Sequence, residues 1–176
     1  MEQNSPVKHE DFNISDLENQ EEFTKNVTYN TLVENLNSLL ANEFTLFTKT
    51  LNFHWNIYGP SFHSVHKFLD NQYHDLLKII DGVAERIREI GSHPIGTLEE
   101  IKDSTNLVEH PGLQPNPLNM IADLMTDHET IDLQIREILH DLDNSLIEDP
   151  GTYDFLTKLI KKHEEMTWML KSHLEK

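Results

Sequence analysis

Apolar residues recur at three- and four-residue intervals along most of this chain, and prolines and glycines interrupt the pattern at three places. This spacing places the apolar side chains on one face of an α-helix, whereas a β-strand would show alternation. The interruptions are Gly59-Pro60-Ser61, residues 92–117 with four prolines and two glycines, and Asp149-Pro150-Gly151. We therefore expect four long helices and an all-α fold.

The predicted helices have caps or breaks at their ends, and the second connection is much longer than the other two. The helices are expected over residues 30–55, 61–91, 117–146 and 152 to nearly the end of the chain, with a short helical turn near 97–101. Four long helices predict a four-helix bundle. The long connection between helices two and three suits a crossover that keeps two helices parallel, as in ferritin-like bundles.

The length and charge of the chain limit its organisation and partners. With 176 residues we expect one domain, namely a bundle over 29–176 preceded by an acidic N-terminal tail over 1–28. The formal net charge is −17, and residues 1–26 hold two lysines against seven acidic residues, a local balance of −5. This charge repels a phosphate backbone and attracts cations, so DNA binding is expected to be weak or absent.

The N-terminal residues 1–25 are polar and lack the apolar run of a secretory signal, and no segment is apolar enough to span a membrane. We therefore expect a cytoplasmic protein. The chain has no cysteine, which excludes disulfides and thiolate ligands. Any metal would be held by imidazole and carboxylate groups, a ligand set that suits iron, manganese or zinc.

Two pairs of candidate metal ligands lie on the second predicted helix: His66 with Asp70, and Asp81 with Glu85. Each pair is spaced i,i+4, so its side chains share a helix face. Eleven residues separate Asp70 from Asp81, which keeps the two pairs on one side of the helix but about 16 Å apart. One ion cannot contact both pairs. If all four residues serve one site, the second pair comes from an antiparallel copy of the chain across a two-fold axis.

The residues around these pairs resemble the Dps family of miniferritins. The match consists of the following motifs in order: Asn52-Phe53-His54-Trp55-Asn56, Gly59-Pro60, His66, Asp70, Asp81, then Ala84-Glu85-Arg86 and Ile90-Gly91. The resemblance implies a shell of twelve subunits with two ferroxidase sites at each two-fold interface. It assigns His54, His66 and Asp70 to one subunit and Asp81 and Glu85 to its partner, as both metal ligands and catalytic residues.

The same resemblance implies the reaction and the cargo. Family members oxidise ferrous iron, preferentially with hydrogen peroxide, and store ferric mineral in the central cavity, which protects against oxidative damage. Iron is thus the expected metal, with zinc as a competitor.

Asp149 and Asp154 fall near the acids that line the family's three-fold pores, although Lys158 lies one turn beyond Asp154. Trp55 is expected either over the site or at an interface.

Several other residues have plainer interpretations than metal binding. Glu137 and His140 form a Glu-x-x-His motif, but an intrachain di-iron centre needs two copies, so a solvated helix face is preferred. Seven histidines match no ligand spacing and are expected at the surface or at helix ends: His63, His74, His93, His110, His128, His163 and His173. In the acidic tail, His9, Glu10 and Asp11 are a further possible metal-binding group.

Two functions compete with the ferroxidase. The first is a structural protein that coats and condenses DNA, which would have a basic arm and would keep its function after Asp81→Ala. The second is an intrachain di-iron oxidase or a zinc-binding assembly protein, which would be active as a monomer or would depend on Glu137.

Overall fold

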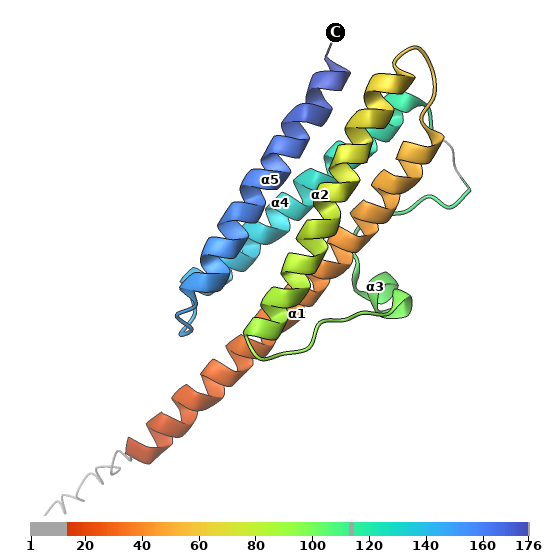
Figure 1. Ribbon diagram of the computed structural model, residues 1–176. Coiled ribbons are helices and arrows are strands. Elements are labelled where there is room, and N and C mark those ends of the chain that lie inside the picture. The colour runs from red at the N-terminus through yellow and green to blue at the C-terminus, as the bar shows by residue number, and fades with distance from the viewer. Residues whose placement is uncertain (1–13, 113–114, 176) are drawn as a thin grey trace, which may run out of the picture.

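The computed structural model describes residues 14–112 and 115–175, and within these ranges it holds five α-helices and no strand. Figure 1 shows the long helices side by side and the short helix beside them. The helices are α1 (Ile14–Asn56), α2 (Phe62–Glu89), α3 (Leu98–Ser104), α4 (Pro117–Asp143) and α5 (Pro150–Leu174). In this part of the chain, no helix is both long and apolar enough to cross a membrane.

The long helices form two antiparallel hairpins, α1 with α2 and α4 with α5, and α1 also packs against α4. The connection from α2 runs back along the outside of the bundle and carries α3, so that α2 and α4 point in the same direction (Figure 1). Asn42 of α1 holds this crossover, because its side-chain oxygen accepts hydrogen bonds from the Thr105 hydroxyl at 2.8 Å and the Asn106 amide at 2.7 Å. The expected ferritin-like four-helix bundle with a short helix in the crossover is confirmed.

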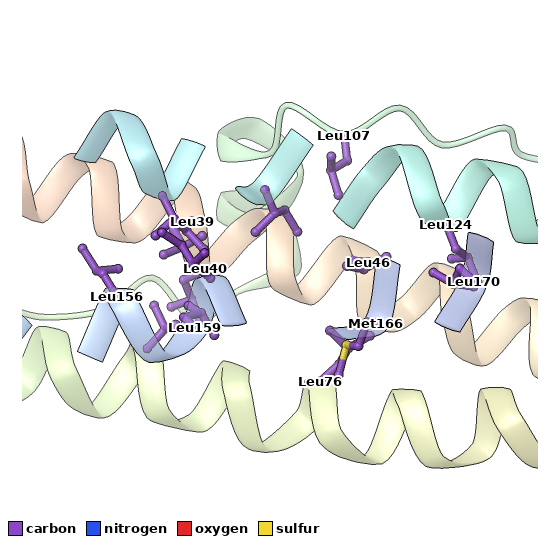
Figure 2. Close-up of a cluster of buried hydrophobic side chains, with 14 of the residues drawn as sticks. Leu39, Leu40, Leu46, Leu76, Leu107, Leu124, Leu156, Leu159, Met166 and Leu170 are labelled. Carbon is purple, nitrogen blue, oxygen red and sulfur yellow. The ribbon is translucent and has the colours of Figure 1, made fainter. Parts of the chain in front are cut away.

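The apolar stripes of the four long helices meet in one continuous core. Figure 2 shows that α1, α2, α4 and α5 all contribute leucine or methionine side chains, together with Leu107 of the crossover. Burial of these side chains is the main stabilising contribution to such a bundle, at roughly 25 cal/mol per Å² of apolar surface. The spacing that predicted the helices therefore also identified the faces that pack.

Local capping explains where most of the helices begin. The Asn116 side chain accepts from the Asn119 amide and the Asp149 side chain from the Thr152 amide, each just before a proline at the first helical position. Thr97 forms a reciprocal capping box with Glu100 at the start of α3. Ser61 occupies the N-cap position of α2 but makes no side-chain capping bond.

The first helix begins earlier than expected, at Ile14 rather than near residue 30, and α4 ends at Asp143 rather than near 146. Figure 1 shows the early part of α1 projecting beyond the bundle. Packing begins near Tyr29, whose hydroxyl donates to the Ile90 carbonyl, and Leu32 is buried. The boundary between tail and bundle at residue 29 stays a prediction, and His9, Glu10 and Asp11 lie outside the described residues.

Candidate metal centre

His54 and His66 are joined by two reciprocal hydrogen bonds across the α1–α2 hairpin. His54 Nδ1 lies 2.9 Å from the His66 carbonyl oxygen, and His66 Nδ1 lies 2.8 Å from the His54 carbonyl oxygen. The hairpin turn that brings them together contains Gly59 at φ +100°, a backbone conformation that favours glycine. The two imidazole rings stack with centroids 3.8 Å apart and an interplanar angle of 19°.

These bonds determine which ring nitrogen carries the proton. A carbonyl oxygen only accepts, so each Nδ1 must be the donor, and in the neutral imidazole each Nε2 then keeps its lone pair. The assignment follows from the hydrogen-bond network. Metal-binding histidines commonly use such an arrangement, in which one ring nitrogen donates to a carbonyl oxygen while the other ring nitrogen binds the ion. His54 and His66 therefore each have an Nε2 lone pair that could bind a metal ion.

Asp70 follows His66 by one turn of α2 and is partly exposed. Its Oδ1 accepts a hydrogen bond from the Tyr73 hydroxyl at 2.9 Å, and Lys67 Nζ lies 3.4 Å from its Oδ2. The Tyr73 bond is the main cause that lowers the pKa of Asp70 below its ordinary value. The carboxylate is thus ionised and oriented on the same helix face as His66.

Two aromatic residues enclose the histidine pair, and sequence reasoning missed both. Phe62 stacks on His66 with ring centroids 5.0 Å apart, and Tyr73 packs edge-to-face with His54 at 5.2 Å. Their spacing was a usable signal, since Tyr73 lies three residues after Asp70 and Phe62 lies four residues before His66, both on the same helix side. Trp55, in contrast, is 66% exposed and makes no ring contact with His54 in the described structure.

Asp81 and Glu85 lie further along α2 and are both exposed. Neither carboxylate has a hydrogen-bond or ion-pair partner within residues 14–112 and 115–175. The eleven residues between Asp70 and Asp81 correspond to roughly 16 Å of helix. In the described chain, no three His, Asp or Glu side chains converge on one point as they must to hold a metal ion. One chain therefore presents a histidine–aspartate group and a separate carboxylate pair.

Comparisons with known proteins identify the family. A family model described as a ferritin-like domain matches residues 33–176. The chain is 31% identical over 143 residues to DNA protection during starvation protein 2 of Bacillus anthracis, covering 81% of this chain and 96% of that protein. It is 40% identical over 140 residues to a low temperature-induced protein of Nostoc sp., covering 80% of this chain and 78% of that protein. The chain belongs to the Dps family of ferritin-like proteins.

Solved Dps structures share the fold. Dps from Staphylococcus aureus is 29% identical, covers 82% of this chain and 95% of its own, and superposes with a TM-score of 0.76. The Dps protein of Vibrio cholerae, described as a member of a superfamily of ferritin-like diiron-carboxylate proteins, is 28% identical with a TM-score of 0.78, covering 85% and 92%. Membership of the Dps family supports an iron-storage function of the miniferritin type.

The two acids expected near the Dps pores are both engaged within the chain. Asp149 caps α5 and accepts a hydrogen bond from Arg86 Nη2 at 2.8 Å. Burial raises the pKa of Asp149, but the hydrogen bonds from Thr152 and the Arg86 charge outweigh this effect, and the pKa is lowered overall. Asp154 is exposed and paired with Lys158. Their role in a pore stays a prediction.

Two of the seven unassigned histidines are not at the surface. His128 of α4 and His163 of α5 are completely buried, so the expectation of surface or capping positions was wrong for this pair. Their Nδ1 atoms lie 2.9 Å apart, and His163 Nε2 lies 2.8 Å from Glu43 Oε1 on α1. Glu137 and His140 are exposed on α4, as expected for a solvated face.

Proposed function

We propose that this Dps-family chain oxidises ferrous iron at sites formed between two copies of itself and stores the ferric product inside a shell of twelve subunits. The supporting observation is the division of ligands along one chain. His54 and His66 present free Nε2 atoms with Asp70 beside them, and the unpartnered Asp81 and Glu85 lie too far along α2 to reach the same ion. A two-fold axis between antiparallel α2 helices would bring the two groups together.

The ligand chemistry fits iron as the substrate. Neutral imidazole and carboxylate both bind ferrous iron, and carboxylates favour the ferric product still more. In the reaction, two ferrous ions each lose one electron, and hydrogen peroxide takes up these two electrons and two protons to give two water molecules. A site with few protein ligands per ion leaves positions free for the oxidant. Zinc binds the same ligand set and is expected to compete.

The charge of the chain favours metal cargo over nucleic acid. A net charge of −17 attracts ferrous ions and opposes contact with a phosphate backbone. The DNA-coating function therefore has no supporting feature in the described residues. The proposal also places the shell in the cytoplasm.

The test uses the assembled protein loaded anaerobically with ferrous iron and then given a pulse of hydrogen peroxide. We would compare the wild type with Asp81→Ala and with Glu137→Ala, which removes an exposed carboxylate on α4 and serves as the matched control. The oxidation rate and the soluble ferric iron are recorded. Fast oxidation in the wild type and Glu137→Ala, but not in Asp81→Ala, would support the intersubunit site.

Other results would contradict the proposal. Equal oxidation by all three proteins would show that Asp81 takes no part. Loss of oxidation in Glu137→Ala alone would indicate that oxidation takes place at the Glu-x-x-His motif within one chain.

A further inference from the structure

Tyr73 contacts two candidate iron ligands that come from different helices. Its hydroxyl donates to Asp70 Oδ1 on α2 at 2.9 Å, and its ring lies edge-on to His54 of α1, with centroids 5.2 Å apart and an interplanar angle of 66°. A single side chain thus links the histidine pair to the neighbouring carboxylate.

We infer that Tyr73 is a positioning residue that occupies Oδ1 of Asp70 and leaves Asp70 to bind iron through Oδ2 alone. This inference rests on the proposed ferroxidase function. It adds a role for a residue that is not itself a ligand, and it states how Asp70 binds the ion.

The argument begins with the two oxygens of the Asp70 carboxylate. Oδ1 is engaged by a neutral donor at ordinary hydrogen-bond length, and such a bond to a charged acceptor is stronger than one between neutral groups. The neighbour of Oδ2 is Lys67 Nζ at 3.4 Å, a long contact made by an exposed side chain. An arriving cation would displace Lys67 easily, because exposed ion pairs contribute little stability. Oδ2 is therefore the available oxygen.

The packing of the Tyr73 ring fixes its hydroxyl before any ion arrives. The ring also contacts Phe47 of α1, with centroids 6.3 Å apart and an interplanar angle of 70°. Contacts with both His54 and Phe47 hold the ring against α1 while its backbone belongs to α2. The donor is thus preorganised, and the carboxylate cannot rotate freely to present both oxygens to one ion.

One-oxygen binding matters for the reaction. A carboxylate that binds through both oxygens fills two coordination positions, whereas one oxygen fills one. Holding Asp70 to one oxygen keeps a position open, which the peroxide needs if it is to reach the ion. Tyr73 therefore tunes both the affinity for the ion and the access of the oxidant.

The test is Tyr73→Phe in the assembled shell, with Co²⁺ as a spectroscopic probe in place of ferrous iron. The variant removes one hydroxyl and keeps the ring. We expect roughly 10- to 100-fold weaker Co²⁺ affinity, because the Asp70 carboxylate is then no longer oriented before the ion arrives; this is the usual effect of removing a hydrogen-bond partner of a metal ligand. We also expect a changed visible Co²⁺ spectrum, which a purely structural role would not alter. Tyr153→Phe, at an exposed tyrosine of α5, is the matched control and should match the wild type.

The remaining outcomes separate this inference from the proposed function. If Asp81→Ala loses Co²⁺ binding while Tyr73→Phe keeps wild-type affinity and spectrum, the role of Tyr73 is wrong and the proposed site stands. A lower melting temperature of Tyr73→Phe without a change in affinity or spectrum would also overturn the inference. If Asp81→Ala binds Co²⁺ like the wild type, the proposed intersubunit site is wrong, and the inferred role of Tyr73 is then wrong too.

Discussion

Lys49 of α1 and Asp127 of α4 form an ion pair inside the bundle, with Nζ 2.6 Å from Oδ2 and side chains only 5% and 8% exposed. Lys49 also donates to the Val108 carbonyl of the crossover at 2.8 Å and lies 3.5 Å from Asp123. Burial raises the pKa of Asp127 above its ordinary value, while the Lys49 charge opposes this effect. One ammonium group thus joins α1, α4 and the crossover.

Replacing Lys49 with Met should destabilise the bundle strongly. The substitution leaves Asp127 buried without a cation and the Val108 carbonyl without its donor, and breaking a buried pair in this way typically costs about 3–5 kcal/mol. Urea unfolding of wild type and variant at equal protein concentration measures the difference in the free energy of unfolding.

The control for this prediction is Lys158→Met, because Lys158 pairs with Asp154 at the surface. An exposed pair contributes about 0–1 kcal/mol, so this variant should unfold close to the wild type. Similar losses in both variants would mean that burial does not determine the strength of the Lys49 pair.

The buried His128 should make the bundle less stable in mild acid. Burial is the main cause that lowers the pKa of His128 well below 6.5, and the charge on His163 lowers it further. The unfolded chain takes up a proton near the ordinary pKa, so below about pH 6.5 it binds more protons than the folded chain. His128 should therefore reduce the free energy of unfolding by at most about 1.4 kcal/mol per pH unit as the pH falls.

The prediction is tested by comparing slopes of stability against pH rather than absolute stabilities. His128→Leu also removes the hydrogen bond to His163, and Glu43 remains nearby, so its stability at neutral pH will differ for other reasons. Its slope between about pH 6.5 and 5 should be shallower than that of the wild type. His140→Gln, at an exposed histidine of the same helix, should keep the wild-type slope. Parallel slopes for all three proteins would contradict the prediction.

The buried histidines also show how far the sequence alone could lead. Leu124 and Ile131 are buried on α4, and His128 lies between them at four and three residues' distance, in register with the apolar stripe. That register predicts burial of His128, whereas the spacing between potential metal ligands carries no information about it. The bonding partners His163 and Glu43 lie on other helices, and no spacing within one helix identifies such a contact.

The helices could be predicted from the sequence wherever their apolar residues pack into the core. Apolar spacing identified all four long helices, because each buries one face in the core. The same signal failed for residues 14–28 of α1, which are largely polar and lie in the part of the helix that projects beyond the packed bundle. His54 and His66 could be paired from motif order, whereas their reciprocal carbonyl bonds depend on the hairpin geometry and became visible only in three dimensions.

Arg86 should contribute to stability rather than to iron chemistry, although it follows Glu85 directly. Its guanidinium donates to the Asp149 carboxylate at 2.8 Å and to the Thr152 hydroxyl at 2.8 Å, joining α2 to the start of α5. Arg86→Met leaves a half-buried carboxylate without its cation and should cost about 1–3 kcal/mol. Thermal unfolding at fixed protein concentration measures this loss.

The matched control is Arg88→Met, because Arg88 is exposed and donates to the Ser92 carbonyl near the end of the same helix. This variant should differ little from the wild type in stability. Slower oxidation per correctly assembled Arg86→Met shell would contradict a purely structural role.

The division of ligands between two chains predicts that two inactive variants restore each other. His66→Ala and Asp81→Ala should each lose oxidation in shells of one variant. In a mixed dimer, one interface site lacks both groups and the other has both intact, so about a quarter of all sites should recover after random reassembly of equal amounts. Unmixed shells taken through the same disassembly serve as the control, with oxidation by peroxide as the measurement. A site built within one chain would stay inactive in every mixture, because no chain there carries both His66 and Asp81.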